Sequence, residues 1–220
     1  MTDGKRRNKM FQLRLLSLRR NYKITVPQSG FLLRPPQGED YEQWSKLREE
    51  SREFLKPWEP TWPADDLTPI GFQRRLRSYD RQRRAGTGQT FFLFDSGSIR
   101  LIGGLSLTRI MHGFSRSATL GYWMGKPYAN KGVMQQCVPA LLDFAFQELR
   151  LQRVEAACLP VNSRSRHLLQ KCGFKREGFA KKYLEINGQR EDHVLLAVLK
   201  SDLPKLKSAE NAGKPYFTVV

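Results

Sequence analysis

The chain contains two kinds of apolar pattern: short apolar runs, and longer segments in which apolar positions recur every three or four residues. The first pattern is typical of strands and the second of amphipathic helices. The predicted strands are 31–34, 90–95, 99–110, 117–124, 153–159, 182–186 and 193–199. The predicted helices are 39–54, 65–84, 132–149 and 163–171. This order of elements predicts an α/β domain with a mixed sheet.

Turn-forming residues indicate how these elements connect. Short glycine-containing turns join the strands between residues 90 and 124, which predicts an antiparallel meander. Asn187-Gly188 lies between two apolar runs and predicts a hairpin. Prolines interrupt residues 55–63, so we expect a loop there, and its tryptophans Trp58 and Trp62 need other parts of the protein to pack against.

The length of 220 residues fits one domain with a full core, and we find no internal repeat. Residues 1–26 are basic and poor in acids, and they are assigned to an N-terminal extension. Residues 27–203 form the predicted domain. The polar, basic residues 204–220 are assigned to a C-terminal tail.

The formal net charge of +17 changes the picture, because it predicts attraction to a polyanion. Nucleic acid, an acidic membrane surface and a polyphosphate cofactor all fit, and a solvated basic surface with no single partner stays open. The basic arm and the predicted helix 65–84 are candidate RNA contacts. That helix carries Arg74, Arg75, Arg77, Arg81, Arg83 and Arg84.

The cysteine content and the hydropathy of the chain indicate its cellular compartment. Cys137, Cys158 and Cys172 are odd in number and scattered, which argues against disulfides or a zinc site and favours buried thiols in a reducing compartment. No apolar run is long enough to span a bilayer. We therefore expect a cytoplasmic protein with no metal and no membrane association.

The stretch GYWMGKPYANKGVM, residues 121–134, leads from a predicted strand into a predicted helix. Such a junction directs free backbone N–H groups and the positive end of the helix dipole to one place. Gly132 allows close backbone approach, Asn130 tolerates a left-handed conformation, and Lys126 and Lys131 add charge. These features indicate a pyrophosphate site. A helix start with incidental glycine and lysine remains the alternative.

A second stretch, VNSRSRHLLQKCGF, residues 161–174, combines Asn162, Ser165 and Gly173-Phe174. Together with Glu177-Gly178, this spacing resembles motif B of the GNAT superfamily of acetyl-CoA-dependent N-acetyltransferases. The junction at 121–134 resembles motif A of the same superfamily. The resemblance covers roughly residues 31–199. It implies an α/β GNAT-like fold, with a mostly antiparallel sheet of about seven strands that is splayed where acetyl-CoA binds and flanked by helices.

The resemblance also implies roles for individual residues. Asn162 would face the pantetheine and thiol end, and Ser165 would protonate the leaving thiolate. Alternatively, one of these two residues serves only as a helix cap. The family's usual Gln/Arg-x-x-Gly-x-Gly/Ala loop is reduced to its last glycine here, so Asn130 takes the place of the first. The implied acetyl-CoA-binding residues are Trp123, Met124, Asn130, Lys131, Gly132, Val133, Met134, Asn162 and Ser165.

The sequence identifies the general base less clearly than it identifies the residues that bind acetyl-CoA. Many relatives carry a glutamate on the strand before motif A, whereas residues 118–122 read ATLGY. Glu185 and His193 lie on the predicted last hairpin and are the first candidates, followed by Asp192 and Glu177. Catalysis resting on positioning, with water taking the proton, is the alternative. We interpret Tyr122 as a packing or substrate-lining residue.

The segment REESREFLKPWEPTWP, residues 48–63, resembles the branch that contains ribosomal-protein alanine N-acetyltransferases. The resemblance implies transfer of an acetyl group to a protein N-terminal α-amine. One alternative acceptor is a small amine, amino acid or antibiotic in a pocket lined by Phe54, Trp58, Trp62 and Tyr122. A ribosome- or RNA-associated factor without catalysis is the other alternative. A monomer and a homodimer both remain open.

Overall fold

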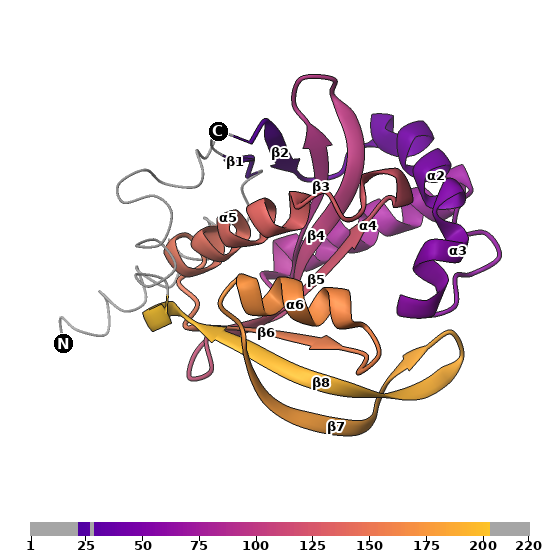
Figure 1. Ribbon diagram of the computed structural model, residues 1–220. Helices are drawn as coiled ribbons and strands as arrows, with labels where there is room; N and C mark the ends of the chain where they lie inside the picture. The colour runs from indigo at the N-terminus through magenta and orange to yellow at the C-terminus, as the bar shows by residue number, and fades with distance from the viewer. Residues whose placement is uncertain (1–21, 27–28, 203–220) are drawn as a thin grey trace.

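The computed structural model describes residues 22–26 and 29–202. Most of the predicted N-terminal extension and all of the predicted tail lie outside these residues. The described chain forms one eight-stranded sheet with the strand order β1-β2-β3-β4-β5-β6-β8-β7 (Figure 1). The strands are β1 Ile24–Val26, β2 Phe31–Arg34, β3 Gln89–Asp95, β4 Arg100–Met111, β5 Ser117–Met124, β6 Arg153–Cys158, β7 Lys175–Ile186 and β8 Gln189–Leu199.

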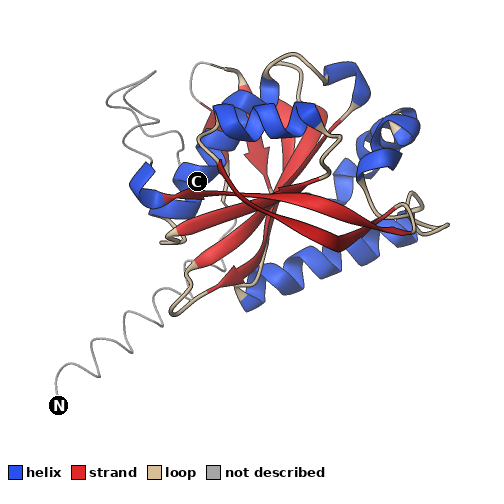
Figure 2. Ribbon diagram, turned by 60° about the horizontal axis from the view of Figure 1, so that its bottom comes forward, coloured by secondary structure: helices blue, strands red, loops and turns tan. Residues whose placement is uncertain are grey.

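Helices cover both faces of this sheet (Figure 1 and Figure 2). They are α2 Tyr41–Glu50, α3 Arg52–Leu55, α4 Pro69–Ala85, α5 Val133–Gln147 and α6 Ser163–Lys171. Alternation along β3 explains the two layers. Phe91 and Leu93 join the core under α5, whereas Phe92 and Phe94 pack with residues of α2 and α4. The predicted α/β architecture is confirmed.

Several predicted boundaries were wrong. The predicted helix 39–54 is a 3-10 turn (Gly38–Asp40) followed by α2 and α3, which are separated at Ser51. Ser51 is fully buried, and its Oγ accepts a hydrogen bond from the backbone N–H of Lys126 at 2.9 Å. The predicted helix at 65 begins only at Pro69, because Thr68 Oγ1 caps it by accepting from the N–H of Gly71 at 3.1 Å.

The strand predictions were incomplete at both edges of the sheet. Tyr22 and β1 belong to the core, although we assigned them to the N-terminal extension. The Asn187-Gly188 hairpin is confirmed, but β7 starts at Lys175 rather than 182, and β8 at Gln189 rather than 193. The extra length of β7 carries many exposed polar residues, so no apolar alternation marks it in the sequence.

The arginines of α4 are less available for binding RNA than their number in the sequence suggests. Four of them form ion pairs with nearby carboxylates of the same chain. The pairs are Arg74–Asp65, Arg75–Asp66, Arg83–Asp80 and Arg84–Asp80. The described part of the chain contains no helix with the length and apolar character needed to cross a bilayer. The three cysteines are buried and free, as predicted.

Candidate active site

The central feature of the site is the point where β5 and β6 separate. These neighbours are parallel and pair only at Ser117↔Arg153, Ala118↔Val154 and Thr119↔Glu155. Beyond Thr119, β5 continues to Met124 and β6 to Cys158 without pairing to each other. Backbone groups facing this gap therefore need other partners.

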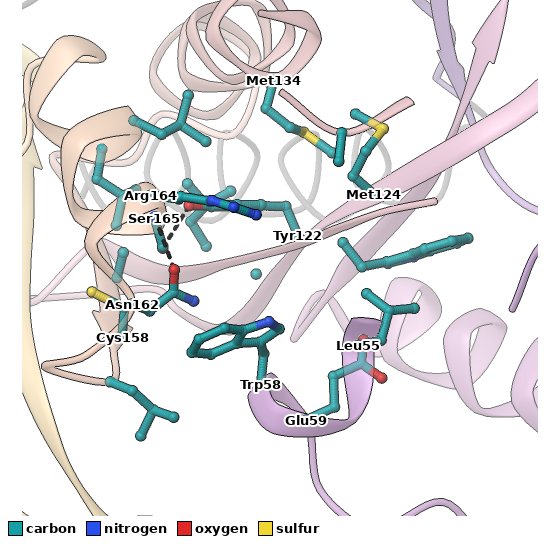
Figure 3. Close-up of a pocket in the computed structure, with 18 of the residues that line it drawn as sticks. Leu55, Trp58, Glu59, Tyr122, Met124, Met134, Cys158, Asn162, Arg164 and Ser165 are labelled. Atoms are coloured by element: carbon teal, nitrogen blue, oxygen red, sulfur yellow. Dashed lines mark hydrogen bonds between the residues drawn. The ribbon is translucent and has the colours of Figure 1, made fainter. Parts of the chain in front are cut away.

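A cavity of about 1200 Å³ occupies the gap. Every residue that we predicted for acetyl-CoA binding, and each of the first candidates for catalysis, lines it. These residues are Trp123, Met124, Asn130, Lys131, Gly132, Val133, Met134, Asn162, Ser165, Glu185 and His193. Segments distant in the sequence thus form one site, and Figure 3 shows part of it.

One end of the cavity is the loop between β5 and α5. Asn130 and Gly132 both have positive φ, 62° and 73°, as their residue types predict. A Cβ built on Gly132 would have no protein atom within 4 Å, so the space in front of this backbone is open. The first N–H groups of α5 have no acceptor within the helix. This end can therefore receive an anion.

In the middle of the cavity, Ser165 is hydrogen-bonded to Asn162 through its backbone and to Tyr122 through its side chain (Figure 3). The backbone N–H of Ser165 donates to Asn162 Oδ1 at 3.0 Å, so Asn162 caps α6. Ser165 Oγ lies 2.7 Å from Tyr122 Oη. Burial raises the pKa of Tyr122 to about 12, although its hydrogen bond to Ser165 opposes the shift. The tyrosine therefore keeps its proton at neutral pH.

Sequence reasoning missed the Tyr122–Ser165 pair, because 43 positions separate the two residues. It also missed Arg164, which extends into the cavity beside Ser165 (Figure 3). The helix end was correctly predicted: Gly173 has a φ of 88°, and the N–H of Phe174 donates to the carbonyl of Leu169 at 3.0 Å.

The other end of the cavity lies between the α3–α4 loop and the β7–β8 hairpin. Phe54 lines it from α3, Trp58 and Glu59 line it from the loop, and residues 184–186 line it from the hairpin. The N–H of Asn187 at the hairpin tip donates to the carbonyl of Glu59 at 3.0 Å. The two segments therefore touch and enclose this end.

The candidate bases differ in their surroundings. His193 is 2% exposed and lines the cavity, whereas Glu185 also lines it but is exposed. His193 Nδ1 lies 2.9 Å from the carbonyl oxygen of Glu191. Because a carbonyl only accepts, Nδ1 carries the proton and Nε2 of the neutral ring keeps its lone pair.

The two secondary candidates do not line the cavity. Glu177 is ion-paired with Arg153, whose guanidinium lowers the pKa of this carboxyl. Asp192 accepts a hydrogen bond from the N–H of Lys182 at 2.8 Å. The structure therefore contradicts both as bases for a reaction in this cavity.

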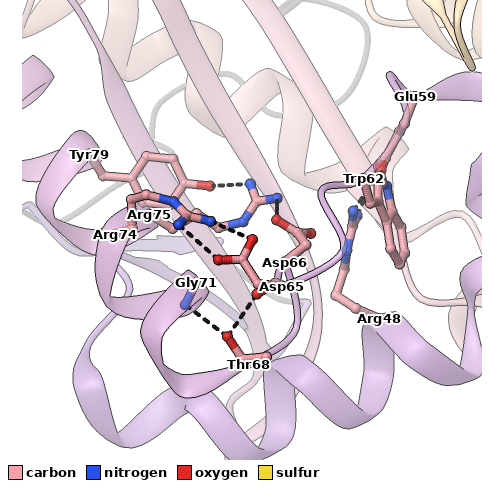
Figure 4. Close-up of polar contacts among 10 residues, drawn as sticks. All are labelled: Arg48, Glu59, Trp62, Asp65, Asp66, Thr68, Gly71, Arg74, Arg75 and Tyr79. Carbon is pink, nitrogen blue, oxygen red and sulfur yellow. Dashed lines mark hydrogen bonds and ion pairs between the residues drawn. The ribbon is translucent and has the colours of Figure 1, made fainter.

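A buried ion pair supports the α3–α4 loop. Arg48, 5% exposed, donates to the two carboxylate oxygens of Glu59 at 2.9 and 2.6 Å. Trp62 Nε1 donates to the same carboxylate at 2.8 Å, and the Arg48 guanidinium lies 4.0 Å from the centre of the Trp62 ring (Figure 4). Trp62 thus packs on Arg48 rather than lining the cavity, which was not foreseen.

Comparison with known proteins identifies the family. Residues 31–175 match the family described as an acetyltransferase (GNAT) domain, which is well over half of the chain. This chain belongs to the GNAT acetyltransferase family. The predicted resemblance is therefore confirmed, and the protein is an N-acetyltransferase by family.

Two relatives show how far the similarity of this GNAT protein extends. Probable N-acetyltransferase YjcK of Bacillus subtilis is 36% identical over 170 residues, 77% of this chain and 94% of its own. [Ribosomal protein uS5]-alanine N-acetyltransferase of Escherichia coli is 36% identical over 153 residues, 70% of this chain and 79% of its own.

The solved structure of a similar protein contains the cofactor. RimJ of Mycobacterium smegmatis in complex with CoA-disulfide has a TM-score of 0.79 and 28% identity, covering 88% of this chain and 95% of its own. GNAT enzymes take their acetyl group from acetyl-CoA. The residues of this GNAT protein fit that group, because the site combines a gap between strands, an open backbone turn at Gly132 and an uncapped helix start.

Proposed function

We propose that this GNAT protein acetylates the N-terminal α-amine of a protein, with a ribosomal protein as the preferred acceptor. The observation that carries the proposal is the enclosed end of the cavity, where the loop and the hairpin meet at Glu59 and Asn187. The α-amine at a free chain terminus can be placed in such a space. The uS5-alanine N-acetyltransferase, at 36% identity, supports the ribosomal acceptor.

We assign acetyl-CoA binding to two parts of the cavity: the turn between β5 and α5, and the gap between β5 and β6. The turn containing Asn130, Lys131 and Gly132, followed by Val133 and Met134, would hold the pyrophosphate through backbone N–H groups and the α5 dipole. The separated backbones of β5 and β6, including Trp123 and Met124, would hold the amide-bearing arm. Bound acetyl-CoA supplies the acetyl group as a thioester.

His193 is the base that the geometry favours. An α-ammonium has a pKa of about 7.7–8.0, so it loses its proton more readily than a lysine side chain does. His193 holds Nδ1–H against the carbonyl of Glu191 and presents Nε2 as the acceptor. Glu185, which lines the same end, is the second candidate for this role.

Ser165 is the proposed acid at the thiol end. Its Oγ–H gives a proton to the departing sulfur, the Tyr122 hydroxyl, 2.7 Å away, replaces that proton, and solvent water then returns a proton to Tyr122. Asn162 keeps Ser165 in place through the helix cap at 3.0 Å. Across the reaction, an N–C bond forms, a C–S bond breaks, and the amine proton goes to His193.

The test is an acetylation assay with a matched set of acceptors. The set contains a ribosomal-protein N-terminal peptide, the same peptide with its α-amine blocked, and spermidine as a small amine. We expect thiol release and an acetyl group on the α-amine of the free peptide alone. Acetylation of spermidine but of neither peptide would support the small-amine alternative. No thiol release, with RNA affinity that falls steeply with salt, would support the non-catalytic alternative.

A further inference from the structure

The last two strands of the chain contain an irregularity beside His193. β7 is an edge strand of the sheet, and its one neighbour is β8 (Figure 1). The antiparallel register pairs Ala180 with His193, and it next pairs Leu184 with Glu191. Three residues of β7, 181–183, therefore lie opposite a single residue of β8. We call these three residues the β7 bulge.

Two side chains of β8 hold the β7 bulge in place. Asp192, the residue opposite the bulge, accepts a hydrogen bond at Oδ1 from the backbone N–H of Lys182 at 2.8 Å. Arg190 Nη1 donates to the carbonyl oxygens of Lys182 and Tyr183, both at 3.3 Å. Lys182 has a φ of 46°, a left-handed conformation that costs free energy in a residue other than glycine. The hydrogen bonds offset this cost, so the bulge is a defined feature of the strand.

The β7 bulge brings an aromatic ring to His193. Successive side chains of a strand alternate between the two faces of the sheet, so His193 and Asp192 face opposite sides. A single β7 residue opposite Asp192 would share its face and point away from His193. With three residues there instead, the ring of Tyr183 reaches the imidazole, with ring centres 5.8 Å apart and ring planes at 62°. Aromatic rings prefer such edge-to-face contacts.

Tyr183 supports His193 from outside the acetyl-CoA cavity. His193 lines the cavity together with residues 184–186, whereas Tyr183 does not line it. The imidazole is buried, and its Nδ1 lies 2.9 Å from the carbonyl oxygen of Glu191. A turn of the ring would break this hydrogen bond, which keeps the proton on Nδ1 and off Nε2. The packed ring of Tyr183 opposes such a turn.

We propose that the β7 bulge positions His193 for proton transfer, with Tyr183 packed on the imidazole and Asp192 holding the bulge. This inference rests on the proposed function, in which His193 accepts the proton of the amine. Tyr183 and Asp192 are positioning residues, because they act through His193 and neither lines the cavity. Asp192 acts as a hydrogen-bond acceptor, so an amide oxygen can replace its carboxylate.

The test compares conservative and disruptive variants at both positions. Asp192→Asn keeps an acceptor oxygen and Asp192→Ala removes it, whereas Tyr183→Phe keeps the ring and Tyr183→Leu removes it. Lys181→Ala is the matched control, because Lys181 is an exposed residue of the bulge and does not line the cavity. His193→Gln tests the base itself. Initial rates give kcat and KM for acetyl-CoA and for the N-terminal peptide, and thermal unfolding shows which variants are folded. The Tyr183 variants keep the test valid if Asp192→Ala does not fold.

The losses should appear in kcat. We expect His193→Gln to lower kcat by about 100-fold or more, as the loss of a general base does. Asp192→Ala and Tyr183→Leu should each lower kcat by about 5- to 10-fold, the rate equivalent of one hydrogen bond or one aromatic contact. The KM for acetyl-CoA should not change, because neither side chain lines the cavity. Asp192→Asn, Tyr183→Phe and Lys181→Ala should keep the wild-type kcat.

Nuclear magnetic resonance separates positioning from a general loss of structure. The chain has three histidines, so isotope labelling of histidine nitrogen gives few signals, and His193→Gln identifies those of His193. The spectra are recorded above about pH 8, where an ordinary imidazole is neutral. The wild-type ring should carry its proton on Nδ1 alone. Asp192→Ala and Tyr183→Leu should show both tautomers.

Each other outcome counts against a stated part of the argument. Wild-type kcat and a single tautomer in Asp192→Ala and Tyr183→Leu would refute the inference. So would an Asp192→Asn variant as slow as Asp192→Ala, because the charge of the carboxylate would then be required. A His193→Gln variant with wild-type kcat would overturn the inference together with the choice of base. A wild-type protein that acetylates no peptide would refute the proposed function, and the tautomer spectra would still decide whether the bulge positions His193.

Discussion

Tyr122 and Ser165 provide a sharp test of the proposed acid, because the two side chains should act in series. Ser165→Ala removes the hydroxyl that faces the cavity, and Tyr122→Phe removes only the group that bonds to it at 2.7 Å. If Tyr122 acts through Ser165, the double variant should be no slower than Ser165→Ala. Independent roles would instead multiply the two losses.

The sizes of these losses follow from the chemistry. General acids contribute about 10²- to 10⁴-fold to rate. A thiol with a pKa of about 8.5 leaves readily, so Ser165→Ala should lower kcat by about 100-fold, the lower limit, or about 2.7 kcal/mol. A single hydrogen bond contributes about 0.5–1.5 kcal/mol, so Tyr122→Phe should lower kcat by about 10-fold at most.

The assay is thiol release at saturating acetyl-CoA and peptide, with calorimetry to show that CoA binding is retained. Gln170→Ala is the matched control, because Gln170 is an exposed residue of the same helix and does not line the cavity. Its kcat should match that of the wild type. A Ser165→Ala variant with wild-type kcat, or a double variant about 1000-fold slower, would refute the serial arrangement.

Three further substitutions test other parts of the structure. Arg48→Met leaves the Glu59 carboxylate without its bidentate partner, so unfolding free energy should fall by about 3 kcal/mol and Tm by about 6–12 °C. Arg74→Met, which breaks the exposed Arg74–Asp65 pair, is the control and should leave Tm unchanged. A Tm of Arg48→Met equal to that of this control would contradict the argument. Asn162→Ala removes the cap of α6 and should cost about 1 kcal/mol, which thermal unfolding would detect. Gly132→Val strains a residue with a φ of 73° and adds a side chain to the open turn. CoA affinity should fall at least about 10-fold by calorimetry, and unchanged affinity would exclude this turn as the pyrophosphate site.

The backbone conformations and the helix cap at the two strand-to-helix junctions of the site were correctly predicted from local sequence. The conformations of Asn130, Gly132 and Gly173 follow from residue type, since asparagine and glycine tolerate positive φ. The cap at Asn162 also depends on residues within one turn of helix. Each of these features is specified by neighbours in the chain, so a sequence pattern can reveal it.

The contacts between segments far apart in the chain could not be predicted in the same way. Arg48 and Glu59, Tyr122 and Ser165, and Glu59 and Asn187 meet only after the chain has folded. The ion pairs of α4 illustrate the same point. The sequence shows a row of arginines that could bind RNA, whereas the fold brings Asp65, Asp66 and Asp80 into ion pairs with them. Charge counts do not reveal such pairs.

The sequence by itself determined the α/β class, the family, the hairpin at Asn187-Gly188 and the turn at Asn130 and Gly132, because those depend on local periodicity and backbone preference. Tertiary structure alone decided that β5 and β6 part after Thr119 and that Tyr122 meets Ser165. Those features arise from strand register and from packing between elements far apart in the chain, and neither leaves a local pattern of residues.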